Sequence, residues 1–258
     1  MTNAVQMFDP SMLESVAIPK APIVLLYAEN GVGKSTFLTT IPHIIVADIE
    51  GKLNNTNVAR FTPGNYEQFK TWLEWLLFQD KLEFKAVGID SADWLLSLID
   101  GFICKNTGAS SISDPYVKAT GFSNGYIMAA NILKNDVLRL IAEIRDKHNV
   151  PFIIVCHAHI VKREDPDVDP YDQYDLKLEK RSAAILSERV EAKVFAKIIR
   201  EKDAKGNLIP TDKRAFICSP QKGISAKNNL KLPDTFEVTE SNGWQDFLNA
   251  LNTKQSTN

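Results

Sequence analysis

The sequence contains few cysteines, no long apolar run and no excess of basic residues. Each of these shortages argues against one class of protein. Cys104, Cys156 and Cys218 are odd in number and lack metal-ligand spacing, which indicates reduced thiols in a cytoplasm-like compartment. No segment approaches the ~20 apolar residues that a membrane span requires, and the acidic residues near the N-terminus are not typical of a signal peptide. Lys and Arg total 30 against 32 Asp and Glu, for a net charge of −2. Any nucleic-acid-binding surface must therefore be local.

What the chain does have is an alternation of short apolar strands and amphipathic helices. Its 258 residues, 44% of them hydrophobic, are enough for a large α/β core. The patterns predict strands at 23–27, 43–48, 84–90 and 151–156, helices at 34–40, 65–79 and 126–148, and a hairpin of strands at 193–200 and 214–219. This order predicts a mainly parallel sheet with helices on both faces and a C-terminal β-hairpin.

Other segments are expected to lie outside this core or to be irregular. Residues 1–20, interrupted by prolines, are expected to form an extension whose "MFDPSML" either docks on a neighbouring subunit or packs on its own core. The core is expected at 21–240, followed by a helix and a tail with a disordered end at 241–258. Residues 106–125, rich in Ser, Gly and Thr, predict a mobile loop, and the polar residues 160–181 predict a second loop.

The stretch "LLYAENGVGKSTFL" places a glycine-containing loop between a strand and a helix. It fits the phosphate-loop pattern G-x-x-x-x-G-K-[ST], with Ala28 at the first glycine position. Such a loop cradles polyphosphate with backbone N–H groups, its lysine reaches the β- and γ-phosphates, and its Ser hydroxyl binds Mg²⁺. The alternative is an ordinary glycine turn. The predicted nucleotide-binding residues are Ala28, Glu29, Asn30, Gly31, Val32, Gly33, Lys34, Ser35 and Thr36.

Polar side chains end three further strands, where ligands gather in α/β sheets. Asp90 ends "AVGID" and is predicted to join Ser35 as a Mg²⁺ ligand, although an acid at this place is also a common turn residue. Glu50, just after "VAD", is predicted to polarise the attacking water; a solvated loop residue is the alternative. His157 follows "IIVC" and either senses the γ-phosphate or is a structural histidine.

Taken in order, the phosphate loop, "DIEG" and "GIDS" resemble the RecA-like recombinase core. The resemblance implies that Glu50 is the catalytic glutamate and that Asp90 and Ser91 end the Walker B strand. A Gln usually ends the next strand in that family and senses the γ-phosphate, and here His157 stands in its place.

The chain is more similar still to the short phage-encoded RecA-like single-strand annealing proteins, a family of phage nucleotide-binding proteins. They carry a late "aKn" segment after a strand, which "SPQKGISAKNNLKLP" resembles at Ala226, Lys227 and Asn228. A basic residue usually follows, and Asn229 departs from that pattern. The resemblance covers residues 20–235.

This resemblance implies an ATP- and Mg²⁺-dependent ATPase, slow or DNA-stimulated, that oligomerises on single-stranded DNA and promotes annealing. It implies a ring or filament with ATP between subunits, in which Lys222 or Lys227 reaches the γ-phosphate of a neighbour. The segments 106–125 and 160–181 correspond to the DNA-facing loops. A single-strand DNA-binding protein is a further implied partner, a membrane is not, and the host cytoplasm is the implied location of a phage-encoded protein.

Two other functions, from different classes of protein, are alternatives to this one. A nucleotide-gated adaptor or helicase-loader-like ATPase would act mainly on a protein partner, and the net charge of −2 and the acidic residues within 160–181 favour it. A small-molecule kinase would use the same phosphate loop. It ranks last, because a kinase is expected to have a lid with several arginines and no Arg-rich segment follows the fourth strand.

Overall fold

Apolar runs of the sequence form the strands of a central sheet, and amphipathic segments between them form the helices that cover it. The computed structural model describes residues 19–114 and 125–253. The strands are β1 (Ile23–Ala28), β2 (Ile44–Asp48), β3 (Ala59–Phe61), β4 (Ala86–Asp90), β5 (Phe152–Asp165), β6 (Val168–Leu176), β7 (Ala192–Lys202), β8 (Leu208–Ile217), β9 (Lys227–Asn228) and β10 (Thr235–Thr239). The helices are α1 (Lys34–Thr39), α2 (Tyr66–Phe78), α3 (Ala92–Thr107), α4 (Gly125–Ile132), a π-helical turn (Leu133–Val137), α5 (Leu138–His148), α6 (Lys180–Arg189) and α7 (Gly243–Thr253).

The sheet is parallel at its centre and antiparallel at one side. Its strands follow the order β10-β8-β7-β1-β5-β4-β2-β3, with β6 paired to β5 and β9 paired to β7. The pairs among β7, β1, β5, β4, β2 and β3 are parallel, whereas β8 and β10 are antiparallel to their neighbours. The predicted mainly parallel sheet with a C-terminal β-hairpin is confirmed.

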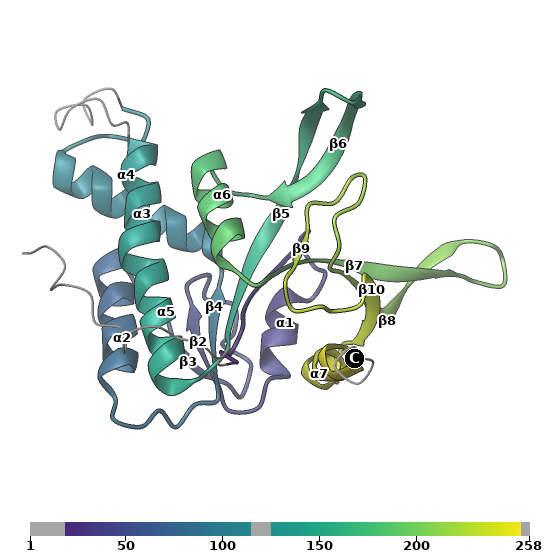
Figure 1. The fold of residues 1–258 in the computed structure, drawn as a ribbon, viewed down its shortest axis with the longest axis horizontal. Coiled ribbons are helices and arrows are strands. Elements are labelled where there is room, and N and C mark those ends of the chain that lie inside the picture. Colours follow the sequence, from purple (N-terminus) through teal and green to yellow (C-terminus); the bar gives the residue numbers. More distant parts are fainter. Residues whose placement is uncertain (1–18, 115–124, 254–258) are drawn as a thin grey trace, which may run out of the picture.

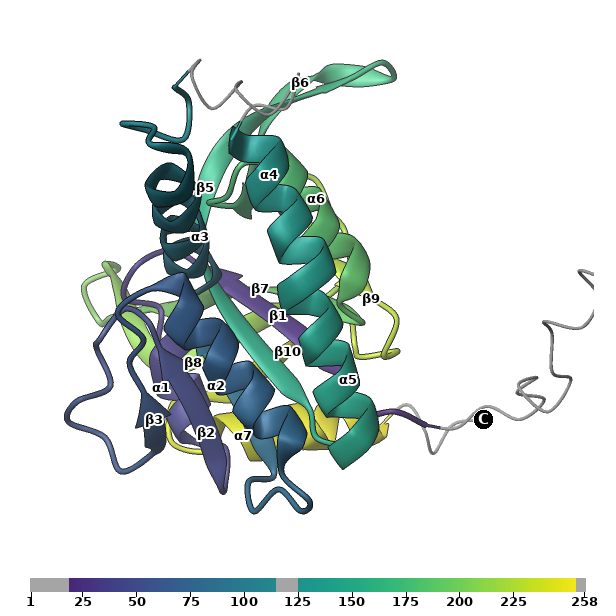
Figure 2. The same ribbon diagram turned by 90° about the vertical axis from the view of Figure 1, so that its left-hand side faces the viewer.

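Helices cover both faces of the sheet, as Figures 1 and 2 show. On one face, α2, α3, α5 and α6 pack on a cluster of buried side chains that includes Tyr27, Phe69 and Ile141. On the other face, α1 and α7 pack on a second cluster that includes Phe37, Phe216 and Phe247. Because both faces are buried, the central strands consist of continuous apolar residues, which is why the sequence reveals them so clearly.

The largest departure from the predicted elements lies at 160–181, which the polar composition indicates to be a loop. There β5 continues through Asp165, turns, and returns as β6, with Ala158 opposite Leu176 and Arg163 opposite Tyr171. The prediction fails because both faces of this hairpin are largely exposed, so its strands need not show the apolar alternation that marks a half-buried strand. Two hairpins, β5–β6 and β7–β8, extend from the body of the molecule in Figure 1.

Other predictions fall partly outside the described residues. The stretch "MFDPSML" lies within 1–18 and so falls outside, as does half of the loop expected at 106–125, namely 115–124. At the other end, α7 supplies the expected C-terminal helix and stops at Thr253. Within the part of the chain that the structure describes, no helix combines the length and apolarity needed to cross a bilayer.

Candidate active site

The loop after β1 has the backbone of an anion cradle. All six residues of β1 are buried, so the loop starts from a fixed strand end. Gly31 and Gly33 have φ of 77° and 101°, values that favour glycine because other residues carry a Cβ that clashes there. Gly33 also caps α1, and it provides no side-chain hydrogen bond to the first turn. The backbone N–H groups at this end of the loop therefore face a position where an external anion can be bound.

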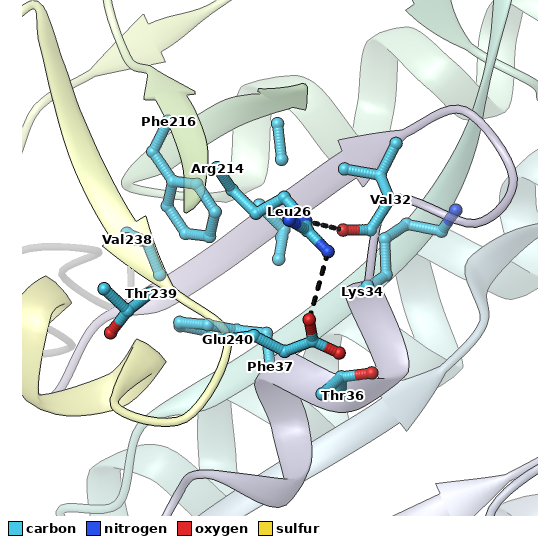
Figure 3. A pocket seen from close by; sticks show the side chains of 12 residues that line it. Leu26, Val32, Lys34, Thr36, Phe37, Arg214, Phe216, Val238, Thr239 and Glu240 are labelled. Carbon is cyan, nitrogen blue, oxygen red and sulfur yellow. Dashed lines mark hydrogen bonds and ion pairs between the residues drawn. The ribbon is translucent and has the colours of Figure 1, made fainter. Parts of the chain in front are cut away.

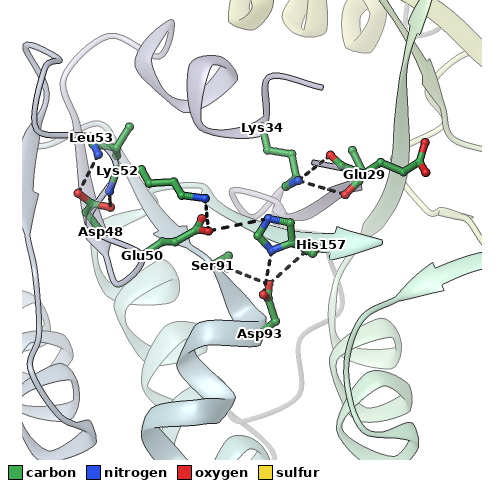
Figure 4. A network of polar contacts seen from close by, with 10 residues as sticks. Glu29, Lys34, Asp48, Glu50, Lys52, Leu53, Ser91, Asp93 and His157 are labelled. Carbon is green, nitrogen blue, oxygen red and sulfur yellow. Dashed lines mark hydrogen bonds and ion pairs between the residues drawn. The ribbon is translucent and has the colours of Figure 1, made fainter. Parts of the chain in front are cut away.

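Lys34 is a buried cation at this loop. Its side chain folds back, and Nζ donates to the carbonyl oxygens of Ala28 at 3.1 Å and Glu29 at 3.0 Å (Figure 4). The residue is only 7% exposed. Burial lowers the pKa of Lys34 from its ordinary value, and the negative charge of Asp90 partly opposes that shift. Within the described residues no carboxylate forms an ion pair with Lys34, so the site holds a positive charge that a phosphate would complement.

Asp90 ends β4 as a buried acid with an unused oxygen. The residue is 1% exposed, and its Oδ2 has no hydrogen-bond partner among the described residues. Burial raises the pKa of Asp90 to about 6, while a hydrogen bond from the Ser35 hydroxyl acts in the opposite direction. The two predicted Mg²⁺ ligands are therefore neighbours. A hard divalent cation takes oxygen ligands of this kind, and the unpartnered carboxylate oxygen fits such an ion.

Glu50 is brought beside Asp90 by the end of β2. The backbone N–H groups of Ile49 and Glu50 donate to the carbonyl oxygen of Asp90 at 2.7 and 3.1 Å, which joins the ends of β2 and β4. The Glu50 side chain is 7% exposed and forms an ion pair with Lys52. A solvated loop side chain, the alternative considered from the sequence, would be far more exposed.

Asp48 shapes the turn that carries Glu50. Its fully buried carboxylate accepts hydrogen bonds from the backbone N–H groups of Lys52 and Leu53, each at 3.0 Å. These two bonds curl residues 49–53 over the end of β2. Figure 4 shows the result, with Glu50 and Lys52 turned toward His157 and away from Asp48.

His157 is held by Asp93, a residue that the sequence analysis does not single out. The His157 ring Nδ1 lies 2.8 Å from Asp93 Oδ2, and the His157 backbone N–H donates to Asp93 Oδ1 at 3.2 Å. The Ser91 hydroxyl donates to the same Oδ1 at 2.8 Å. Burial alone would raise the pKa of Asp93, yet hydrogen bonds from His157 and Ser91 hold it below its ordinary value. This clamp leaves Nε2 of His157 facing Glu50 Oε1 at 4.0 Å.

Lys222 and Lys227 lie apart from this group. Lys227 Nζ donates to the carbonyl oxygens of Ser187 at 3.2 Å and Glu188 at 2.7 Å, near the end of α6. Lys222 is exposed, with Nζ 5.7 Å from the centre of the Tyr171 ring. In this single chain neither lysine joins the phosphate loop, so contact with the nucleotide of a neighbouring subunit stays a prediction for both.

A sequence model described as AAA domain matches residues 20–230. The chain belongs to the AAA-domain family. In this AAA-domain protein the phosphate loop implies nucleotide binding.

Comparisons with solved structures and curated proteins add little to this assignment. The structure of the RadB recombinase has 14% identity and a TM-score of 0.45, and the match covers 86% of this chain and 90% of that one. The flagellar accessory protein FlaH from Methanocaldococcus jannaschii has 12% identity and a TM-score of 0.43, with 86% of each chain covered. At this similarity neither protein's function transfers to the AAA-domain protein. No curated protein sequence matches the chain.

Proposed function

We propose that the protein binds ATP with Mg²⁺ at its phosphate loop and hydrolyses it. The observation that carries the proposal is the convergence of Lys34, Asp90, Glu50 and His157 at the carboxyl ends of four neighbouring parallel strands. Strand register supports it, since Ala28 lies opposite His157, and Asp48 opposite Asp90. An ordinary glycine turn would not need a buried lysine, an unpartnered buried carboxylate and a clamped histidine around it.

Each residue has one part in this reaction. Lys34 leaves the carbonyl oxygens that it now contacts and pairs with the β- and γ-phosphates, while Ser35 and Asp90 supply oxygens for the metal. Mg²⁺, when bound, neutralises the charge that develops on the phosphate oxygens. Glu50 accepts a hydrogen bond, and then a proton, from the attacking water. His157, oriented by Asp93, places its Nε2 between Glu50 and the phosphate end of the site.

Substituting Glu50 by Gln tests this assignment. Glu50→Gln keeps the shape of the side chain but removes its basicity, so ATP binding is expected to persist while turnover falls by about 10²- to 10⁴-fold. Binding is measured by calorimetry and turnover by phosphate release, with and without single-stranded DNA. Glu83→Gln, at an exposed glutamate before β4, is the matched control and should hydrolyse ATP like the parent. Parental turnover in Glu50→Gln would move the water-activating role to another residue.

The second part of the proposal is that the ATP-bound protein assembles on single-stranded DNA and promotes annealing. A groove of about 700 Å³ beside the β5–β6 hairpin supports it. The basic residues lining it are Lys162, Arg163, Lys180, Lys193 and Lys227. Lys193 is 3% exposed and is bound by Asp175 at 2.6 Å. Lys162, Arg163 and Lys180 are exposed and can contact backbone phosphates.

The groove lies next to the candidate active site along one strand. β5 passes from His157, beside the phosphate loop, directly into the hairpin that borders the groove. Single-strand binding proteins combine a positive groove with aromatic stacking platforms, and the half-buried Tyr171 lies on β6 of the same hairpin. Assembly would then bring Lys222 or Lys227 of one subunit to the nucleotide of the next.

A nucleotide-gated adaptor that acts on a protein partner is the second candidate. The observation in its favour is the tip of the β7–β8 hairpin, where Leu208 is 64% exposed and Ile209 is 47% exposed. Exposed apolar residues on a projecting element are typical of protein contacts rather than DNA contacts. Signals for single strands and for duplex DNA that equal the no-DNA control, with or without ATP, would favour this candidate over the first.

A further inference from the structure

Arg214 connects the C-terminal strands to the phosphate loop. It lies on β8, where the register places it opposite Val238 of β10 and Ile198 of β7. From there its side chain reaches across to the loop, and Nε donates to the carbonyl oxygen of Val32, as Figure 3 shows. The contact joins residues 182 positions apart.

The guanidinium is nearly fully engaged and well shielded. Nη1 donates to the carbonyl oxygens of Thr211 at 3.0 Å and Lys213 at 3.2 Å, and Nη2 pairs with Glu240 at 3.3 Å. The Arg214 side chain is 12% exposed. A surface arginine that merely contacts solvent would not be fixed from three sides, so its orientation toward Val32 is set by the surrounding strands.

The bond to Val32 controls the direction of the next N–H group. In a trans peptide the carbonyl and the following N–H point in opposite directions. Drawing the Val32 carbonyl toward Arg214 therefore aims the Gly33 N–H the other way, into the cradle of the loop. Gly33 has a φ of 101° and, lacking a Cβ, is free to rotate without such an anchor. One external hydrogen bond thus fixes a peptide unit that would otherwise reorient.

The neighbouring cavity does not offer another explanation. Arg214, Glu240 and apolar residues of α1, β8 and β10 line a space of about 20 Å³. That is about enough for one water molecule, and far too small for a nucleobase. The contact is therefore a closely packed one between the C-terminal strands and the phosphate loop, without room for a ligand.

We propose that Arg214 is a positioning residue that holds the Val32–Gly33 peptide in its phosphate-binding orientation. The proposal rests on the nucleotide binding proposed above. The contact is to a loop carbonyl on the side away from the cradle, so Arg214 acts through the loop and does not touch the nucleotide. Its removal should weaken the capture of ATP more than the chemical step that follows.

Arg214→Gln and Arg214→Lys test the proposal by steady-state kinetics and calorimetry with ATP and Mg²⁺. Hydrogen bonds to charged groups are each worth enough to change affinity about 10- to 100-fold. Arg214→Gln is therefore expected to raise KM and Kd for ATP about 10-fold or more, with kcat within about threefold of the parent. Arg214→Lys, which keeps one positive donor, should recover part of the affinity.

Two controls separate positioning from general stability. Glu240→Gln leaves the bond to Val32 in place and should change Kd for ATP less than Arg214→Gln does. Arg200→Gln, at an exposed position on β7, should bind like the parent. If Arg214→Gln does not fold, Arg214→Lys and Glu240→Gln carry the test, and equal Kd values for these two and the parent overturn the proposal.

Failure of the inference is distinguishable from failure of the proposed function. A lower melting temperature in Arg214→Gln with an unchanged Kd for ATP would show a structural role only. If Lys34→Ala abolishes binding while both Arg214 variants bind like the parent, the inference alone is wrong. If Lys34→Ala also binds ATP like the parent, the proposed nucleotide site itself is wrong.

Discussion

The active-site edge, where the carboxyl ends of β1, β2, β4 and the parallel part of β5 meet, and the β5–β6 groove both contain charged side chains. The two regions differ in whether these side chains are buried or exposed. At the edge, Lys34 and Asp90 are buried, and the carboxylate keeps one oxygen without a partner among the described residues. In the groove, Lys162 and Arg163 are exposed to solvent. Burying a charge without a partner is costly, whereas an exposed lysine costs almost nothing.

This difference in burial distinguishes residues that act in the proposed chemical step from residues that recognise a bound polymer. Residues that must stabilise a reacting group are held in place before the ligand binds. The stability of the rest of the fold offsets the free energy that their burial costs. Residues that contact a repetitive polymer only need to supply charge at a suitable spacing, so they can remain exposed to solvent. Three of the four variants below test this contrast, and the fourth tests an acid on α3 that lies outside both regions.

The largest effect is expected at the buried lysine. Lys34→Ala removes the side chain that we place on the β- and γ-phosphates, so ATP affinity should fall by more than about 100-fold, measured by calorimetry. The fold should persist, because the Lys34 ammonium contacts two carbonyl oxygens that water can satisfy. Lys85→Ala, at an exposed site, serves as the control. Undiminished ATP affinity in Lys34→Ala would mean that the buried lysine does not bind the nucleotide, and the contrast between the two regions would not hold.

A smaller, salt-dependent effect is expected in the groove. The double variant Lys162→Gln/Arg163→Gln removes two phosphate contacts, and each contributes about 0.7 to the slope of log affinity against log salt for single strands. Affinity for a labelled oligonucleotide near 0.1 M salt should therefore fall roughly 25-fold, with a slope shallower by about 1.4. The charge-matched control is Arg200→Gln/Lys202→Gln on the other hairpin. Equal losses in both double variants would show that only net charge matters.

At Asp90, stability and function are expected to move in opposite directions. Asp90→Asn removes an unpaired buried charge, which should stabilise the fold by roughly 1–3 kcal/mol and raise Tm by several degrees in EDTA. Thermal denaturation measures that gain. The same variant should lose the additional Tm increase that Mg²⁺ and ATP give the parent. A destabilised Asp90→Asn protein would mean that the hydrogen bond from Ser35 to the carboxylate outweighs the cost of burying its charge.

The smallest effect is a pH-dependent one on α3. Burial, and then the negative charge of Glu179, raise the pKa of Asp100 to about 6. Because an unfolded Asp titrates near 4, the folded state binds this proton more tightly, and ionisation costs stability as pH rises from about 4 through 6. Asp100→Asn should thus melt about 1–3 °C higher than the parent above pH 6. The gap should close toward pH 4.

The exposed Asp80 provides the control for that measurement, since Asp80→Asn should show no such pH-dependent gap. A gap in Asp100→Asn that stays constant between pH 4 and 8 would mean that amide packing, and not the charge, causes the difference.

The buried part of the molecule could be predicted from the sequence because buried strands and the phosphate loop each have a recognisable local pattern of residues. β1, β2, β4 and β5 are apolar runs, and the phosphate loop needs glycines and a lysine at fixed positions. The proposed roles of Glu50 and Asp90 followed from their places at strand ends. The structure brings both residues together, and their roles await the variants described above.

What could not be predicted depends on contacts between distant segments. Asp93 stands among ordinary helix-start residues, and its bond to His157 spans 64 positions. Arg214 reaches Val32 across 182 positions. The only local signal for Asp93 was an acid in the first turn of a helix that follows "GIDS", and that is common at helix starts in general. Such pairings arise from the register of the sheet, which the sequence patterns did not specify.

The length of β5 has one more consequence. From His157 to Arg163 the strand spans seven residues, about 20 Å at the usual rise of a β-strand, before its pairing with β6 shifts between Arg163 and Asp165. Ala28 of β1 is paired to one part of this strand and Tyr171 of β6 to another. The histidine beside the phosphate loop and the hairpin that borders the groove thus share one continuous strand. A tilt of the strand at His157 would therefore be carried as far as Arg163, at the groove.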